Sequence, residues 1–338
     1  MRLLKKLIMI MTILFVLAGC TSTKRYTAYT IYPIGYLLNR IGGNRIEPIS
    51  IQNKSMVQIA KPVDNYAEIL ADSSVLLHIG DLEPYMDLYR EEMAELVDLS
   101  IGDLSVLNCL YEYKRYTPVI VDGKLSFVEG AYYEGDIFEE IDTYDLDPFI
   151  WLSPSGMYCM AKDVYDYLAN NYVEQSTYFK ENYSQLADEL IALDASYQTL
   201  ANKLVKENKS IKFVSMTGSF GCWQKDFGFQ VYPVCLSKYG ATPSAAQLEA
   251  IKNRIRNDNV QYIAYEQNMS EEMQTLFLQL EDELSLKRIT LHNISSLTQT
   301  QIESGKDYLS LMYENLSVLE SIATDNKVVN NTSSSEGE

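Results

Sequence analysis

The chain has 338 residues, of which 47% are hydrophobic, and this content excludes an intrinsically disordered protein. Its formal charge of −18 at pH 7 excludes a nucleic-acid-binding surface, because such a surface would repel the phosphate backbone. The length is sufficient for two medium-sized lobes, each with its own hydrophobic core.

The first twenty residues have the three parts of a targeting segment. A basic start precedes an apolar run from Leu7 to Leu17, and small residues follow. Leu17-Ala18-Gly19-Cys20 resembles a bacterial lipobox. This resemblance implies a signal peptide at 1–19, a lipidated Cys20 held at the outer face of the cell membrane, and a tether at 20–25. An uncleaved transmembrane anchor is the alternative, but the apolar run is shorter than the ~20 residues that a span needs.

Residues 26–174 alternate between strand-like and helix-like segments, which predicts an N-terminal α/β lobe. The segment RYTAYTIYPIGYLLNRIGGNRIEPISI predicts a strand, a helix and a second strand. A helix at 64–70 and the buried parallel strand SVLLHIG follow. The sequence then predicts a β-hairpin around Asp122-Gly123 and a helix at 157–168. Residues 129–147 are rich in Asp and Glu, which indicates a solvated acidic loop in preference to a weak cation-collecting loop.

A long amphipathic helix is predicted from about Thr177 to Lys206. At roughly 1.5 Å per residue it would reach about 45 Å, more than one small lobe can bury, so residues 175–207 should connect two lobes. A coiled-coil seam between two chains is less consistent with the sequence, since the heptad pattern stops after about four repeats. The apolar positions recur in steps of three and four at Phe179, Tyr183, Leu186, Leu190, Leu193, Tyr197, Leu200 and Leu204.

Residues 208–323 repeat the alternation and predict a C-terminal α/β lobe. Strands are expected at IKFVSM, FQVYPVC, VQYIAYEQ and KRITLHNI, with helices between them and at the end. Thr242 is expected to cap one helix, with Pro243 at its first position. The predicted fold class is therefore α/β, with two doubly wound lobes of parallel-type sheets joined by one long backbone helix. Residues 324–338 are expected to form a mobile tail.

No catalytic constellation stands out, so an enzyme is not expected. His78 and His292 lie in apolar strand-like runs, where a hydrogen-bonded core histidine is the commoner outcome. The turn at 217–221 lacks the lysine of a phosphate-binding loop. The four cysteines after Cys20 form no CxxC or Cys/His spacing, which leaves disulfides and buried free thiols both open. These cysteines are Cys109, Cys159, Cys222 and Cys235.

Seven segments in this order resemble the substrate-binding lipoproteins of zinc and manganese ABC importers. The segments are TIYPIGYLLNRIGG, LEPYM, DPFIWLSP, NYSQLADELIALDASYQTL, FVSMTGSFG, TPSAAQLEAI and DYLSLMYENL. The resemblance implies two α/β lobes on a backbone helix, a zinc or manganese ion between them, and an ABC permease and ATPase as partners. We expect a monomer attached to the membrane through Cys20.

The resemblance fails at the positions where the family holds its metal. The family's DPHxWLSP motif has Phe149 at its histidine, and the other three ligand positions fall near Val57, on Thr217 and near Ser295. These side chains offer at most two weak hydroxyl donors, whereas zinc prefers nitrogen or sulfur and manganese prefers oxygen with imidazole.

Substitute ligands are the next possibility to weigh. Glu266 and Asp147 are weak candidates, and Cys222 or the acidic loop are others. For Glu266, a carboxylate satisfied by backbone amides is the favoured interpretation. Alternatively, an organic solute could bind against Phe149, Trp151, Thr217 and Trp223.

Two functions of different classes follow from this sequence. The first is an extracytoplasmic solute-binding lipoprotein of a metal-type ABC import system, with a degenerate metal site that holds a non-metal solute or an unusually bound metal. The second is a surface adhesion or scaffold lipoprotein that has kept the fold without transport, since fold does not fix function.

Overall fold

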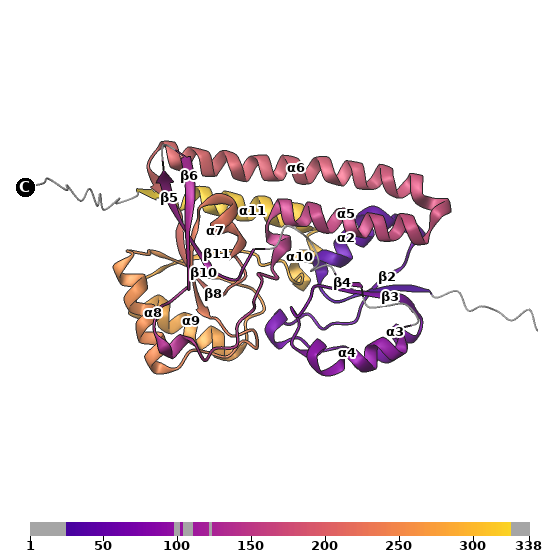
Figure 1. Cartoon of the computed structure of the whole chain (residues 1–338), viewed down its shortest axis with the longest axis horizontal. Helices are drawn as coiled ribbons and strands as arrows, with labels where there is room; N and C mark the ends of the chain where they lie inside the picture. The colour runs from indigo at the N-terminus through magenta and orange to yellow at the C-terminus, as the bar shows by residue number, and fades with distance from the viewer. Residues whose placement is uncertain (1–24, 98–101, 104–110, 122–123, 326–338) are drawn as a thin grey trace, which may run out of the picture.

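The computed structural model describes residues 25–97, 102–103, 111–121 and 124–325. The predicted signal peptide, the predicted lipidation site Cys20, and Cys109 lie outside these ranges. Two α/β lobes lie side by side beneath one long helix, α6, which spans both of them (Figure 1). Within the described ranges, no helix is both long and apolar enough to cross a lipid bilayer.

The N-terminal lobe is built on a four-stranded parallel sheet with the order β2-β1-β3-β4. Its strands are β1 (Tyr26–Tyr29), β2 (Pro48–Ser50), β3 (Ser73–His78) and β4 (Gly102–Asp103). Its helices are α2 (Tyr32–Gly42), α3 (Tyr66–Ala71) and α4 (Tyr85–Leu96), with 3-10 turns η1 (Gly43–Arg45) and η2 (Val57–Ile59). Strand β3 is an almost fully buried apolar run, as parallel strands covered on both faces require.

The C-terminal lobe contains a second parallel sheet, with the order β11-β10-β8-β9. Its strands are β8 (Lys212–Thr217), β9 (Gln230–Cys235), β10 (Tyr262–Tyr265) and β11 (Lys287–Thr290). Its helices are α7 (Cys222–Phe227), α8 (Ala245–Asn257), α9 (Glu271–Glu283), α10 (Gln299–Glu303) and α11 (Tyr308–Ser321). The prediction of two parallel α/β lobes is confirmed.

Helix α6 (Ser176–Lys206) is the connector that the apolar periodicity predicts. It runs beside α5 (Pro154–Asn171), which it follows after the short turn η6 (Val173–Gln175), and along α11 (Figure 1). The Tyr197 hydroxyl donates to the Met312 carbonyl oxygen of α11 at 2.8 Å. One continuous hydrophobic core includes the buried face of α6 and residues of both lobes, so the lobes share a core along this helix. Tyr183, predicted on that face, is half-buried and stacks on Tyr165.

Helix α8 begins later than the sequence analysis expected. Ser244, not Thr242, is the N-cap, and it forms a capping box with Gln247. The Thr242 hydroxyl donates instead to Glu272 at 2.6 Å. The expectation was wrong because it took the Thr-Pro pair as the helix start and overlooked the Ser-x-x-Gln capping pattern that follows it.

The β-hairpin packs on the C-terminal lobe, although the sequence analysis places it within residues 26–174. Strands β5 (Arg115–Val121) and β6 (Lys124–Gly130) pair antiparallel, as predicted. They contact the C-terminal lobe, however: Arg115 donates to Gln230 at 2.8 Å. The short helix η4 (Asp136–Phe138) follows on the same side, and the Tyr133 hydroxyl donates to the Pro233 carbonyl oxygen at 2.8 Å. Part of residues 26–174 therefore belongs spatially to the C-terminal lobe.

The last described residues also differ from the expected tail. Thr324 and Asp325 form β12, which pairs antiparallel with β7 (Lys209–Ser210) just after α6. The chain therefore returns to the C-terminal end of α6 after its final helix, and these two residues are part of the fold.

Candidate functional site

The segment 147–154 crosses between the two lobes at the place where the resemblance puts a metal ligand. It forms η5 (Ile150–Leu152), and Ser153 then caps α5 by accepting from the Gly156 amide at 3.1 Å. Phe149 is only 2% exposed, and its ring lies edge-on to those of Tyr144 and Trp151. Phe149, which aligns with the histidine of the family's DPHxWLSP motif, is therefore a core residue in this structure.

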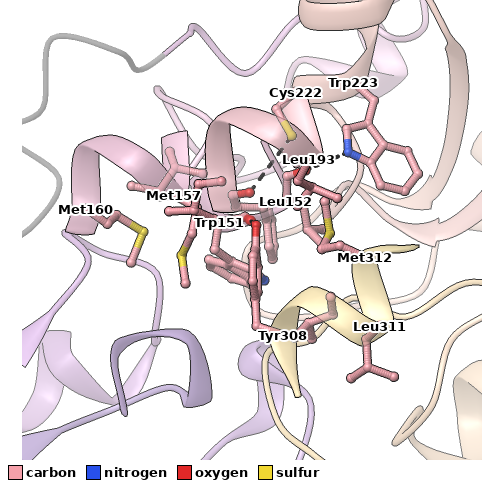
Figure 2. Packing of buried hydrophobic residues seen from close by; sticks show 14 of the residues in the cluster. Trp151, Leu152, Met157, Met160, Leu193, Cys222, Trp223, Tyr308, Leu311 and Met312 are labelled. Atoms are coloured by element: carbon pink, nitrogen blue, oxygen red, sulfur yellow. Dashed lines mark hydrogen bonds between the residues drawn. The ribbon is translucent and has the colours of Figure 1, made fainter. Parts of the chain in front are cut away.

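Trp151 and Trp223 pack in the same buried hydrophobic cluster (Figure 2). The Trp151 indole N–H donates to the Asn293 carbonyl oxygen at 2.7 Å, and the Tyr308 hydroxyl donates to the Trp151 carbonyl oxygen at 2.6 Å. The Trp223 indole N–H donates to the Leu152 carbonyl oxygen at 2.7 Å. Both tryptophans are fully buried, so they act here as packing residues rather than as exposed walls for a solute.

Glu266 follows β10 and is fully buried, and its carboxylate accepts five hydrogen bonds. The Ser215 hydroxyl and the backbone amides of Met216 and Thr217 donate to Oε1 at 3.0, 3.0 and 3.2 Å. The Thr217 hydroxyl and the Asn293 amide donate to Oε2 at 3.1 and 3.2 Å. Burial raises the pKa of Glu266, and these hydrogen bonds oppose the shift. The carboxylate ties the ends of three neighbouring strands together.

The other expected ligand positions are buried too. Thr217 is fully buried, and its hydroxyl lies 2.5 Å from that of Ser219. The Ser295 hydroxyl donates to Asn293 Oδ1 at 3.0 Å. Val57, in η2, is 2% exposed and belongs to the shared core. Their few donor atoms are thus already used within the protein.

The two lobes make direct hydrogen bonds around this site. The Tyr32 amide donates to the Ser295 carbonyl oxygen at 3.0 Å, and the Ser296 hydroxyl donates to the Lys54 carbonyl oxygen at 3.3 Å. The Tyr144 hydroxyl donates to the Leu82 carbonyl oxygen at 3.0 Å. The lobes therefore contact each other through protein atoms at the place where the resemblance predicts a metal between them.

Asp147 is the candidate ligand that does face a cavity. A cavity of about 230 Å³ between the lobes is lined by Asp81, Tyr144, Asp147 and Lys238, among others. Burial raises the pKa of Asp147 to about 7, although the backbone amides of Phe149 and Cys222 oppose the shift. Sequence reasoning missed Asp81, Tyr144 and Lys238 because they come from three separate segments with no shared motif.

The donor set around these residues does not fit a zinc or manganese ion. Over the ranges that the structure describes, no three His, Cys, Asp or Glu side chains converge as a metal site would require. The His292 ring contacts Glu314 and Gln301 at 3.2 Å each, and burial lowers its pKa. His78 Nδ1 lies 3.2 Å from the Gly80 carbonyl oxygen. Both histidines are hydrogen-bonded; His78 is fully buried, whereas His292 is partly buried.

The described cysteines are not paired with one another. Cys159, Cys222 and Cys235 are free thiols, of which the last two are buried. Cys222 lies next to the interface segment, and its thiol is 3.9 Å from the Phe149 carbonyl oxygen. Burial raises its pKa well above the usual value, so it is held as the neutral thiol, a poor metal ligand.

Two α/β lobes that meet face to face and share a backbone helix define the fold of a two-lobed binding protein. The chain belongs to the family described as zinc-uptake complex component A, periplasmic (ZnuA), whose model matches residues 28–322. The family resemblance found in the sequence is confirmed, and so is the two-lobe fold.

Curated relatives match only part of this chain. It is 28% identical to the zinc-binding lipoprotein AdcA of Streptococcus pneumoniae over 54% of this chain and 35% of that protein. It is 26% identical to the high-affinity zinc uptake system protein ZnuA of Bacillus subtilis over 52% of this chain and 53% of that protein. The chain thus spans about a third to a half of the length of these relatives.

Solved structures support the fold across most of the chain. A mutant structure of the laminin-binding adhesin Lmb from Streptococcus agalactiae superposes with a TM-score of 0.68 and 17% identity. That superposition covers 88% of this chain and 98% of that protein. At this identity the likeness establishes the fold alone.

Proposed function

We propose that the protein is the extracytoplasmic solute-binding lipoprotein of an ABC import system of the zinc type, and that it holds no metal at the family's usual place. The family membership and the two-lobe fold support the first part. The observation that carries the second is Glu266, whose carboxylate is saturated by five protein donors.

A metal at the family's usual place would have to displace hydrogen bonds that already stabilise the fold. A tetrahedral zinc site needs four donors, typically His nitrogen, Cys sulfur or carboxylate oxygen. Of the four expected positions, Val57 and Phe149 have no donor atom, and Thr217 and Ser295 offer hydroxyls that are already hydrogen-bonded. To ligate an ion, Glu266 would release at least some of the donors that join β8, β10 and the segment after β11.

The solute that we propose is small, polar and not a metal. The cavity beside Asp147 lies between the lobes, and its volume of about 230 Å³ is below that of typical drug-sized pockets. Its lining includes Asp81, Asp147 and Lys238, residue types that suit a solute with hydrogen-bonding groups of both kinds. The alternative, an unusually held metal, would need a third ligand here.

The partners and location are also part of this proposal. The lipobox-like segment would place a lipid on Cys20 at the outer face of the cell membrane, where the binding protein would deliver its solute to an ABC permease and ATPase. The adhesion or scaffold function is the competing hypothesis, and the adhesin-named neighbour Lmb supports it through the shared fold alone.

Gene deletion in the host separates the two functions. We expect deletion to abolish uptake of a small polar solute, to leave zinc and manganese uptake unchanged, and to be complemented by the wild-type gene. A Cys20→Ala variant should be secreted in a folded, binding-competent form but should complement poorly, because it lacks the anchor. A deletion that alters cell attachment and leaves all solute uptake unchanged would overturn the transport proposal in favour of adhesion.

A further inference from the structure

A second, larger pocket lies at the opposite edge of the C-terminal sheet. Its volume is about 560 Å³, and it lies between the β5–β6 hairpin, the end of α6 and the first residues of β8 and β9. Lys212 and Gln230, which begin these two strands, line it, whereas Thr217 at the lobe interface ends β8. The hairpin and the end of α6 lie at the far end of the molecule from the N-terminal lobe (Figure 1).

The pocket is cationic, although the whole chain is strongly acidic. Its charged lining residues are Arg115, Lys209, Lys212, Arg254 and a single acid, Asp258. Asp258 is already engaged, because it accepts from Arg254 Nε and from the Tyr232 hydroxyl at 2.7 Å each. Burial lowers the pKa of Lys212; Asp258 opposes this shift, and the nearby Arg115 and Arg254 add to it. This cluster of basic residues contrasts with the net charge of −18 for the whole chain.

Arg115 supplies the observation that points to a ligand. Its side chain is only 6% exposed, and Nη2 donates to Gln230 Oε1 at 2.8 Å and to the Tyr232 hydroxyl at 3.1 Å. Nε and Nη1 are buried, and among the residues placed by the structure neither has an acceptor. The nearest carboxylate, Asp258, is 3.7 Å from Nη2. A guanidinium stays charged at all relevant pH values, so Arg115 gives this wall of the pocket a positive charge that its two buried, unpaired nitrogens leave incompletely compensated, and such a charge attracts an added anion.

The rest of the pocket wall is mixed, with apolar side chains beside polar ones such as Thr117 and Asn208. The apolar side chains include Val119 and Leu125 of the hairpin, Leu204 near the end of α6, and Phe227. A cavity of about 560 Å³ lies within the range of pockets for small organic ligands. A bare inorganic ion would leave most of this apolar surface uncovered.

We propose that this pocket binds an organic anion, with a carboxylate or phosphate group at Arg115 and an apolar body against the hairpin and the end of α6. Carboxylates and phosphates both present two or more oxygen atoms that can accept hydrogen bonds from one guanidinium. The site is separate from the lobe interface and does not depend on what the interface binds.

The probe is the fluorescent anion anilinonaphthalene sulfonate, titrated into the folded mature protein. Decanoate and decyl phosphate serve as competitors, and decanol serves as the uncharged control for the apolar body. We expect at least one of the two anions to displace the probe at least tenfold more effectively than decanol. Displacement by decanoate alone, or by decyl phosphate alone, identifies the head group.

Two pocket variants and one matched control complete the test. Arg115→Gln removes the charge, and Val119→Glu places a carboxylate in the half-buried wall; each should weaken probe binding at least tenfold. Val173→Glu makes the same change at a residue that is 70% exposed in the turn before α6, and should bind like wild type. Thermal unfolding by circular dichroism checks that each variant is folded.

Three results would overturn the proposal. The first is equal displacement by decanol and by both anions, which would indicate apolar binding without an anion site. The second is unchanged probe binding in a folded Val119→Glu variant. The third is the absence of saturable probe binding to wild type, which would mean that the pocket does not bind an organic anion.

Discussion

Replacing Glu266 with Gln tests whether this carboxylate is a structural hub. In the wild type its two oxygens accept from five donors on β8 and on the segment after β11. The Gln side chain has the same shape but carries an NH₂ group in place of one oxygen. Whichever way the amide is turned, that group meets donors rather than acceptors.

The expected loss of unfolding free energy depends on which oxygen the NH₂ group replaces. We take Oε2, because it accepts from fewer donors than Oε1. The Thr217 hydroxyl can turn to Ser219, whose oxygen is 2.5 Å away, but the Asn293 amide then loses its acceptor. A buried donor without a partner costs about 1–3 kcal/mol, and the remaining bonds lose their charge assistance. We therefore expect E266Q to lower the free energy of unfolding by about 3 kcal/mol.

The assay is urea unfolding at pH 7.5 in the presence of EDTA, followed by circular dichroism. Glu181→Gln, an exposed position on α6, is the matched control and should change stability by less than about 0.5 kcal/mol. An E266Q protein as stable as wild type in EDTA, but lacking a zinc-dependent stabilisation that wild type shows, would refute the reasoning. That result would make Glu266 a metal ligand.

Three further predictions concern groups elsewhere in the fold. The pKa of Asp147 in the folded protein, about 7, lies above its ordinary value, so the folded state is stabilised while this carboxyl is protonated. As pH rises from 4 to 7, wild type should therefore lose up to about 4 kcal/mol of stability relative to D147N, measured by urea unfolding across that range. The same dependence of unfolding free energy on pH in both proteins would contradict this. Leu190→Ala in the buried face of α6 should cost about 2–5 kcal/mol, whereas Ile191→Ala, at a residue 56% exposed, should cost little in the same unfolding assay. Ser244→Ala should cost about 1 kcal/mol by removing the capping box of α8, and an unchanged thermal midpoint would argue against that cap.

The parts of the fold that the sequence predicted well are those set by local periodicity. The connector helix follows from apolar residues at steps of three and four, and its observed bounds of Ser176–Lys206 lie within a residue of the prediction. Strands β3 and β8 were predicted because buried parallel strands are short apolar runs between turn residues, whereas β4, of only two residues, was not predicted. These signals lie within a few residues of the elements they specify.

Features that depend on distant contacts could not be predicted in this way. The hairpin sits on the C-terminal lobe because Arg115 contacts Gln230, a residue 115 positions away, and nothing in either segment specifies the other. Asp147 and Lys238 likewise meet at a cavity from separate segments. The pocket at Arg115 has the same character, since its cations come from β5, β7, β8 and α8.

Glu266 shows what the sequence could and could not say about the site. Its place after an apolar strand indicated an inward carboxylate, and the favoured interpretation was one satisfied by backbone amides. The structure adds the Ser215 and Thr217 hydroxyls and the Asn293 amide as donors. Asn293 follows β11, whereas the other two residues lie on β8. The sequence pattern did not indicate that Asn293 would donate to Glu266.

The lobe interface gives a physical reason for expecting little lobe movement. Protein–protein hydrogen bonds and a shared core along α6 hold the lobes together at the place where a metal would otherwise join them. Trp151 adds to this contact through its hydrogen bond to Asn293. The place where the resemblance predicts a metal is thus filled by apolar and hydrogen-bonding contacts between protein atoms.

Metal titration of the mature protein tests the central claim most directly. The protein is purified from its own host, its metal content is measured by mass spectrometry, and zinc and manganese are then titrated by calorimetry after EDTA treatment. We predict substoichiometric metal as purified and no binding tighter than a Kd of about 10 µM for either ion. One equivalent of zinc or manganese bound with nanomolar affinity, and lost in E266Q, would contradict the account.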